Sequence, residues 1–131
     1  MNRTQNLQLP QWEANDRVTR AEVNVAFAKL DGALRCATGS YVGTGGYGSG
    51  APTSLTLPFP PKLLLLGGPN SDNYCAVYWP ELGTFSYSFA HYTIDHVTVS
   101  ADGCTLTWYS DASEARQFSA AGVTHRWLCI G

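Results

Sequence analysis

The sequence has few charged residues and no block of charge of either sign. Asp, Glu, Lys and Arg make up 14% of the 131 residues, and the formal net charge is −2. Proteins that bind nucleic acid usually carry a basic excess or a basic patch. The nearest cationic grouping here is Arg17 with Arg20, which is too sparse for that purpose. The composition therefore predicts no nucleic-acid partner.

Long apolar runs are also missing. The longest run of one apolar residue type is four leucines, far short of the roughly 20 apolar residues that cross a bilayer as a helix. No membrane insertion is expected. Residues 1–10 are polar and lack the apolar core of a secretory signal peptide, so we expect synthesis in a cytoplasm.

Metal-binding patterns are absent as well. The four cysteines are widely separated and show no CxxC or Cys/His spacing typical of zinc. Three of them lie in apolar alternating segments, which favours buried free thiols over disulfides. The positions are Cys36, Cys75, Cys104 and Cys129. We expect no metal and no cofactor.

The strongest local signal is the start of a helix. Thr19 is a good N-cap, and Glu22 three residues later completes a capping box. Val18 and Val23 are placed to form a hydrophobic staple around that cap. The pattern predicts a helix from Thr19 to about Leu34, preceded by an extended lead-in that contains Pro10.

The apolar residues of this helix form a narrow seam. They recur at spacings of 4, 3 and 4 residues, as in a coiled coil. An isolated helix this short is marginal in water, so the seam packs either on its own domain or on identical helices around a symmetry axis. The helix alone leaves both alternatives open. The seam residues are Val23, Phe27, Leu30 and Leu34.

After Cys36 the chain is rich in Gly, Ser, Thr and aromatic residues and has no helical periodicity. The clearest hairpin signal is Asp102-Gly103, flanked by alternating apolar residues at 97, 99, 106 and 108. Short strands about every 10 residues predict an antiparallel β-sandwich. We therefore expect a lead-in with a helix in residues 1–36 and a sandwich in 37–131. The strand candidates are 53–59, 62–67, 74–79, 84–89, 93–100, 104–110 and 125–130.

Three segments resemble a known family. "LPQWEANDRVTRAEVNVAFAKLDGAL" resembles the N-terminal segment of small tail-fibre or baseplate-associated proteins from phages and prophages of Gram-positive gut bacteria. "GSYVGTGGYGSGAPTSLTLPFPPKLLLL" is similar to a recurrent β-module of phage tail proteins, and "AAGVTHRWLCIG" is similar to the usual end of that module. The resemblance covers nearly the whole chain. It implies a homotrimeric tail appendage, with the helix first and a β-sandwich last.

The four leucines at 63–66 fit a strand that is covered on both faces. Alternate leucines of such a strand face the core, and the other two need another cover. Leaving two leucines in water would forgo roughly 3–6 kcal/mol per chain. The cover is either a neighbouring subunit, which we favour, or the glycine-rich loop of the same chain. We assign Leu63 and Leu65 to the trimer interface.

Catalytic motifs are weak. There is no HExxH or GxSxG motif, and Asp95 and His96 are neighbours on a predicted strand, so they point to opposite faces. Glycoside cleavage would need two carboxyl groups roughly 5–10 Å apart in a cleft. The available carboxylates lie in turns and loops of a small domain, so we expect no enzyme and no catalytic residue. They are Glu81, Asp102, Asp111 and Glu114.

Binding is the remaining function. Aromatic rings stack on sugar faces, while Asn and Asp side chains orient hydroxyl groups. Two segments combine these types, "GPNSDNYCAVYW" and "WYSDASEARQF", whereas Trp108 and Trp127 are expected in the core. The predicted ligand-binding residues are Tyr47, Asn70, Asp72, Asn73, Tyr74 and Asp111.

The whole pattern predicts a non-enzymatic tail component of a virion, assembled in the host cytoplasm. Its trimeric sandwich would recognise a host-surface glycan, and Leu7–Trp12 would dock on other tail or baseplate proteins. One alternative is a structural tail cap or spacer without a ligand. Another is a tail tip that degrades polysaccharide.

Overall fold

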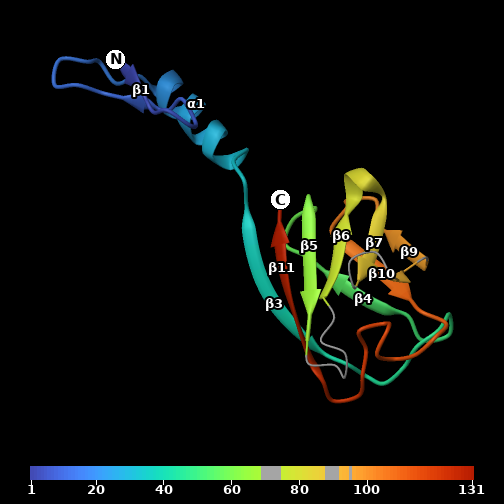
Figure 1. The fold of residues 1–131 in the computed structure, drawn as a ribbon. Helices are drawn as coiled ribbons and strands as arrows, with labels where there is room; N and C mark the ends of the chain where they lie inside the picture. The colour runs from blue at the N-terminus through green and yellow to red at the C-terminus, as the bar shows by residue number, and fades with distance from the viewer. Residues whose placement is uncertain (69–74, 88–91, 95) are drawn as a thin grey trace. The chain divides into compact units, whose positions relative to one another are not determined.

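The computed structural model describes residues 1–68, 75–87, 92–94 and 96–131. The chain divides into two compact units, Met1–Leu34 and Arg35–Gly131, each considered by itself below (Figure 1). We call them the helical unit and the β unit.

The helical unit begins with a small ladder and ends with a helix. Strand β1 (Asn2–Arg3) pairs antiparallel with β2 (Pro10–Gln11), so part of the predicted lead-in is a two-stranded sheet. Helix α1 covers Arg20–Asp31. The Thr19 hydroxyl accepts from the Glu22 N–H at 3.3 Å, and the Glu22 carboxylate accepts from the Thr19 N–H at 3.1 Å. The predicted capping box is confirmed.

The apolar seam is largely uncovered within the helical unit. No residue of Arg20–Asp31 is buried, and Phe27 is 64% exposed. The helix ends at Asp31 with Gly32 as its C-cap, so the prediction that it continues to about Leu34 is wrong, and Leu34 lies beyond it. Of the other seam residues, Leu30 is exposed and Val23 is half-buried.

The β unit contains two antiparallel sheets among the described residues. The six-stranded sheet has the order β3-β11-β5-β6-β7-β8, and the three-stranded sheet has the order β4-β10-β9. The predicted mainly β, antiparallel fold with one short helix is confirmed. The strands are β3 (Cys36–Val42), β4 (Thr53–Thr56), β5 (Leu63–Gly67), β6 (Cys75–Trp79), β7 (Thr84–Tyr87), β8 (Tyr92–Thr93), β9 (His96–Val99), β10 (Thr105–Tyr109) and β11 (Thr124–Ile130), and a 3₁₀ turn, η1 (Pro80–Leu82), joins β6 to β7.

Each of the seven strand candidates corresponds to an observed strand, and β1, β2, β3 and β8 are additional. Glycine is uncommon in strands, so "CATGSYV" is a weak strand signal. The structure gives Gly39 a packing reason, because a Cβ atom there would lie 2.3 Å from the Trp127 ring. The ring of the neighbouring strand β11 occupies the space that a side chain would need.

The predicted hairpin at Asp102-Gly103 is confirmed. It joins β9 to β10, and Val99 pairs with Leu106 in the expected register. Gly103 has a φ of +76°, a conformation that glycine adopts without a steric penalty. The Asp102 carboxylate accepts from the Cys104 N–H at 3.0 Å, and hydrogen bonds from Ser100 and Cys104 lower the pKa of Asp102.

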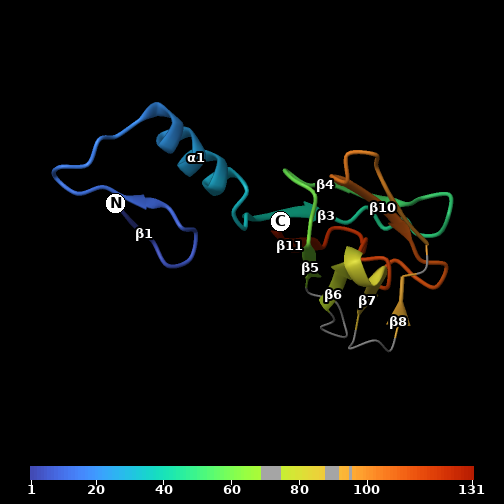
Figure 2. The ribbon, with the colours of Figure 1, turned by 90° about the horizontal axis from the view of Figure 1, so that it is seen from above.

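The inward faces of the two sheets build one core. Trp108 of the three-stranded sheet is fully buried, and its ring meets Phe85 of the six-stranded sheet edge-on, with centroids 5.3 Å apart. Figure 2 shows β4 and β10 on one side of the unit and β6 and β7 on the other. Trp108 is a core residue, as predicted, and Trp127 packs against the core as a partly buried ring.

The four leucines of β5 divide between the two faces of the six-stranded sheet. Leu64 and Leu66 are fully buried in the core, whereas Leu63 and Leu65 are half-buried on the outward face. Residues directly opposite in an antiparallel pair share a face. The register therefore surrounds these two side chains with further apolar residues, and we call the group the leucine face: Leu63, Leu65, Val77, Leu128 and Ile130.

The cysteines are free but mostly not buried. All four are unpaired, as predicted. Only Cys129 is buried, so the prediction of buried thiols is wrong for Cys36, Cys75 and Cys104. Cys36 and Cys75 are exposed because the strand register places them on the outward side of the six-stranded sheet, beside Ile130 and Gly67.

Candidate functional site

Three segments meet at one end of the three-stranded sheet. They are the start of β9, the end of β10 and the glycine-rich loop 43–52 that joins β3 to β4. The Gly48 N–H donates to the Ser110 carbonyl at 3.0 Å, which fastens the loop to the residue after β10. Tyr47 and Asp111, predicted from separate parts of the sequence, are thus the direct neighbours of two bonded residues.

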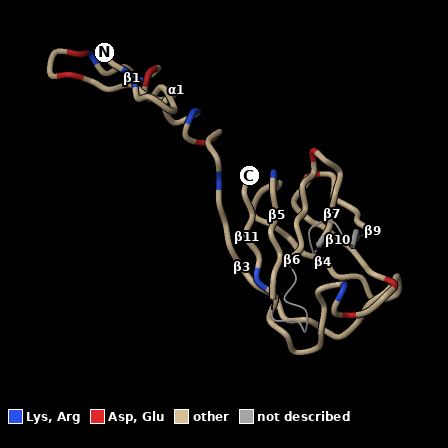
Figure 3. Tube along the Cα trace, in the orientation of Figure 1, with Lys and Arg blue, Asp and Glu red and all other residues tan. Residues whose placement is uncertain are grey.

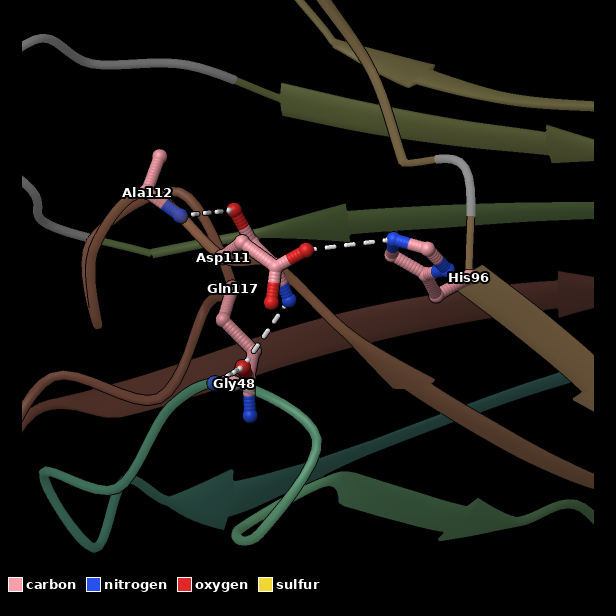
Figure 4. A network of polar contacts seen from close by, with 6 residues as sticks. Gly48, His96, Asp111, Ala112 and Gln117 are labelled. Carbon is pink, nitrogen blue, oxygen red and sulfur yellow. Dashed lines mark hydrogen bonds and ion pairs between the residues drawn. The ribbon is translucent and has the colours of Figure 1, made fainter.

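A buried amide holds this loop in place. The side-chain Oε1 of Gln117 accepts from the Gly48 N–H at 2.9 Å and from the Ser110 N–H at 3.0 Å (Figure 4). Its Nε2 donates to the Ala51 carbonyl at 2.8 Å and to the Thr53 hydroxyl at 3.0 Å. Gln117 has no exposed surface. A single side chain therefore joins the glycine-rich loop, β4 and the end of β10.

The backbone at Gln117 and Phe118 also accepts hydrogen bonds from buried or half-buried side chains. The Trp108 Nε1–H donates to the Gln117 carbonyl at 2.8 Å, and the Tyr41 hydroxyl donates to the Phe118 carbonyl at 2.7 Å. Phe118 has a φ of +57°, which is uncommon for a residue with a side chain. Ser119 is buried as well, and its hydroxyl donates to the Gly46 carbonyl at 2.5 Å. Residues 117–119 thus form a rigid support under the loop.

Two rings and a carboxylate lie at the same end of the three-stranded sheet, at the start of β9 and at or just after the end of β10. His96 and Tyr109 are directly opposite each other in the β9–β10 pair, so their side chains share a face. The rings are parallel within 6°, with centroids 4.2 Å apart. His96 Nε2 lies 3.3 Å from the Asp111 carboxylate, which is 71% exposed (Figure 4). The carboxylate has most of its surface free for a ligand.

A pocket opens beside the stacked pair. Its volume is about 290 Å³, and its walls combine ring surface with hydroxyl groups. Ser49 and Pro52 of the glycine-rich loop form one side, and strands β9 and β10 form the other. The lining residues from these strands are His96, Val97, Thr98, Thr107 and Tyr109.

The outward surface of the three-stranded sheet continues from this pocket as a field of hydroxyl groups. We call it the hydroxyl face: Ser54, Thr56, Thr98, Thr105 and Thr107. The Ser54 and Thr107 hydroxyls lie 3.1 Å apart, as do those of Thr56 and Thr105. Thr98 donates to the Thr107 carbonyl at 3.4 Å. These cross-strand contacts keep the hydroxyls in fixed positions.

Charge is nearly absent from the sheets. Among the described strands of the β unit, Arg126 is the one residue that is Lys, Arg, Asp or Glu. Figure 3 shows the other charged positions of this unit in loops and at strand ends. The pocket and the hydroxyl face are therefore polar without being charged, except at the Asp111 edge.

The predicted ligand-binding residues fall into two groups. Tyr47, 49% exposed, and Asp111 lie on neighbouring segments at the pocket end of the sheet. The other four, Asn70, Asp72, Asn73 and Tyr74, lie outside the described residues. Their proposed role stays a prediction.

Three residues at or near the pocket are not among the predicted ligand-binding residues: His96, Tyr109 and Gln117. His96 was considered only with Asp95, its neighbour on the same strand. Its actual partner is Asp111, fifteen positions along the chain and brought near by the hairpin. Gln117 sits in a polar stretch that reads as a linker, and no local pattern marks it as buried.

One buried histidine lies apart from this site. His125 has no exposed surface, and neither ring nitrogen has a hydrogen-bond partner in the part of the chain that the structure describes. Its ring stacks on Tyr41, with centroids 5.2 Å apart. Burial lowers the pKa of His125 and raises that of Tyr41. Because this ring is enclosed and burial disfavours its charged form, it belongs to the core.

Within the described residues no group of three or more His, Cys, Asp and Glu side chains is arranged to hold a metal ion. The same residues contain no helix with the length and hydropathy needed to span a membrane. Comparisons with protein-family models, with curated proteins and with solved structures found no match.

Proposed function

We propose that this protein is a non-catalytic tail component of a phage or prophage, in which a trimer of β-sandwiches recognises a glycan on the host surface. The observation that carries the proposal is the pocket beside the His96–Tyr109 stack, bordered by the Asp111 carboxylate. The resemblance to tail proteins supplies the biological setting.

The composition of the pocket supports glycan recognition. A flat ring surface offers stacking for the C–H face of a sugar, and hydroxyls and a carboxylate offer directed hydrogen bonds. Tyr109 and His96 provide the rings, and Asp111 provides an exposed acceptor. Gln117 makes the site rigid before a ligand arrives, which lowers the entropy cost of binding.

Two uncovered apolar surfaces support self-association. Within the helical unit Phe27 and Leu30 of α1 are exposed, and the spacing of the apolar residues fits a bundle of identical helices. The leucine face is a second apolar surface, with Leu63 and Leu65 at its centre. The glycine-rich loop is bonded to Ser110 and Gln117 at the end of the other sheet, which disfavours it as the cover.

Three copies would also give the site avidity, because linked binding events reinforce one another. The lead-in Leu7–Trp12 would then attach the trimer to other tail or baseplate proteins, so the protein would reside in the virion tail. A structural cap or spacer would share the trimer and the attachment but would have no ligand.

Binding to bacterial cells and to a glycan array tests the proposal directly. The full chain should bind as a trimer, established by light scattering, and Tyr109→Ala should weaken binding about tenfold, the equivalent of about 1.4 kcal/mol. Asn73→Ala with Tyr74→Ala tests the predicted residues outside the described part. Thr84→Val, an exposed position on the other sheet, is the matched control.

The alternatives predict different results. A trimer that enters tail particles but binds no cells and no glycan would be a structural cap. Release of reducing ends from host envelopes, lost in Asp111→Asn or Glu114→Gln, would indicate a polysaccharide-degrading tip. A monomer at micromolar concentration would contradict the assembly.

A further inference from the structure

We infer that the pocket takes one sugar residue of an uncharged polysaccharide, and that the neighbouring residues of the same polymer lie along the hydroxyl face. This inference rests on the proposed glycan recognition and names the substrate class of that site. It depends on the size of the pocket, on its charge and on the surface that continues from it.

The size of the pocket limits what enters it. Its volume of about 290 Å³ is at the lower limit of ligand pockets, which hold drug-sized molecules at about 300–1,000 Å³. A single ring-sized unit fits such a volume, whereas a branched oligosaccharide does not. The remainder of a longer ligand must therefore lie outside, on the adjoining sheet.

The charge of the pocket selects against anionic polymers. Phosphate and carboxylate groups are bound mainly by Arg and Lys. None of the described residues that line the pocket is Arg or Lys, and the Asp111 carboxylate borders it through His96. An anionic sugar would approach the Asp111 carboxylate without a Lys or Arg among the described lining residues to bind it.

The stacked pair provides a flat surface for an uncharged ring. In the parallel stack each ring covers one face of the other, and both residues line the pocket. The His96 side chain is 43% exposed, so part of that ring is accessible to a ligand. Stacking on such a face needs no charge on the sugar.

The hydroxyl face has the remaining hydrogen-bonding capacity that a polysaccharide requires. A hydroxyl group carries one donor and two acceptor positions. The contacts of Ser54 with Thr107 and of Thr56 with Thr105 use one position on each oxygen and leave the other two outside these contacts. Because these contacts orient each hydroxyl group, they also set the directions of its remaining donor and acceptor positions.

Threonine is also frequent in strands for reasons unrelated to binding, so the hydroxyls need a direct test. Thr107→Val keeps the shape and the strand preference and removes the hydroxyl. The matched control is Thr84→Val on β7, an exposed threonine of the other sheet. Melting curves of both variants check that the fold is retained.

The experiment measures binding of the full chain to immobilised polymers at low and high salt. The neutral probes are a mannan, a dextran and a galactan, the anionic probes are poly(glycerol phosphate) and hyaluronan, and the cationic probe is chitosan. We expect binding to a neutral polymer with little salt dependence. Tyr109→Ala should reduce it about tenfold, Thr107→Val a few-fold, and Thr84→Val not at all.

Each other result overturns the inference in a recognisable way. Binding to charged polymers alone, or neutral binding that Tyr109→Ala, His96→Ala and Thr107→Val all leave unchanged, overturns it and leaves glycan recognition intact. If no polymer binds, the inference fails. If bacterial cells are not bound either, the proposed function fails with it.

Discussion

The two outward faces of the β unit have opposite chemistry. The hydroxyl face of the three-stranded sheet presents Ser and Thr side chains in cross-strand contact, whereas the leucine face of the six-stranded sheet presents half-buried aliphatic side chains. Both faces lie over the same core. The difference indicates that the outward side of one sheet suits contact with water or a hydroxylated ligand, and that the outward side of the other would gain stability from further burial.

The difference originates in strand patterning. Strands β4 and β10 read "TSLT" and "TLTWY", in which apolar side chains point inward and hydroxyls point outward. Strand β5 reads "LLLLG" and is apolar on both sides. Strands of the second kind are typical of sheets that are covered on both faces.

The largest effect is expected from a charge on the leucine face. Leu65→Asp removes burial worth about 1.5–3 kcal/mol in each chain and would place a charge in each interface. The proposed trimer should dissociate to monomers at micromolar concentration, as measured by sedimentation velocity. Thr107→Asp, on the opposite face, should leave the trimer intact. If both variants remain trimeric, the leucine face is not the interface.

The next prediction concerns Gln117, whose side chain joins the glycine-rich loop to the end of β10. Gln117→Ala removes the Gln117 partner of the Ser110 N–H and of the Ala51 carbonyl, while the Gly48 N–H keeps its bond to the Ser110 carbonyl. A lost hydrogen bond costs about 0.5–1.5 kcal/mol where water can reach the groups, so we expect a loss of about 1–3 kcal/mol in the free energy of unfolding. Urea denaturation measures it. Gln117→Glu, which keeps an acceptor, should differ from Ala by retaining part of the pocket's ligand affinity.

A smaller effect is expected on the pH dependence of the free energy of unfolding, and it comes from His125 in the core. Burial holds the pKa of His125 below its ordinary value of 6.5, so below that pH the unfolded chain takes up a proton before the folded one does. The free energy of unfolding should therefore be constant above pH 6.5 and fall below it, by at most about 1.4 kcal/mol per pH unit from this group. His125→Phe should remove that part of the slope, and an unchanged slope would contradict a buried neutral ring.

The smallest expected effect is a change in the alkylation rate of a cysteine beside the leucine face. Cys75 is exposed beside the leucine face, and Cys104 is half-exposed at the β9–β10 hairpin. Alkylation of Cys75 should slow several-fold on assembly, because a neighbouring chain covers it, while Cys104 should react at the same rate in both states. Mass spectrometry of tryptic peptides follows both sites in one sample. Equal rates for Cys75 before and after assembly would argue against a covered leucine face.

Much of the local structure could be predicted because its signals are short-range. The capping box depends on Thr19 and Glu22 alone, and the hairpin depends on Asp102-Gly103 and the alternation around it. Of the predicted ligand-binding residues, Tyr47 and Asp111 lie near the pocket, and their role in binding stays a prediction. His96 and Tyr109 lie together because the register of the hairpin pairs them. A local sequence pattern within one strand does not predict such a pair, because the pair depends on the register of both strands.

By itself the sequence determined the helix with its cap, the antiparallel β-strands and the apolar character of β5, because these follow from propensity and periodicity over a few residues. Only the tertiary structure decided that Leu64 and Leu66 face inward while Leu63 and Leu65 face outward, since a strand apolar on both sides has no preferred face until it pairs. It also decided that Gln117 is buried, because the partners of its amide come from segments that lie up to 71 residues away along the chain.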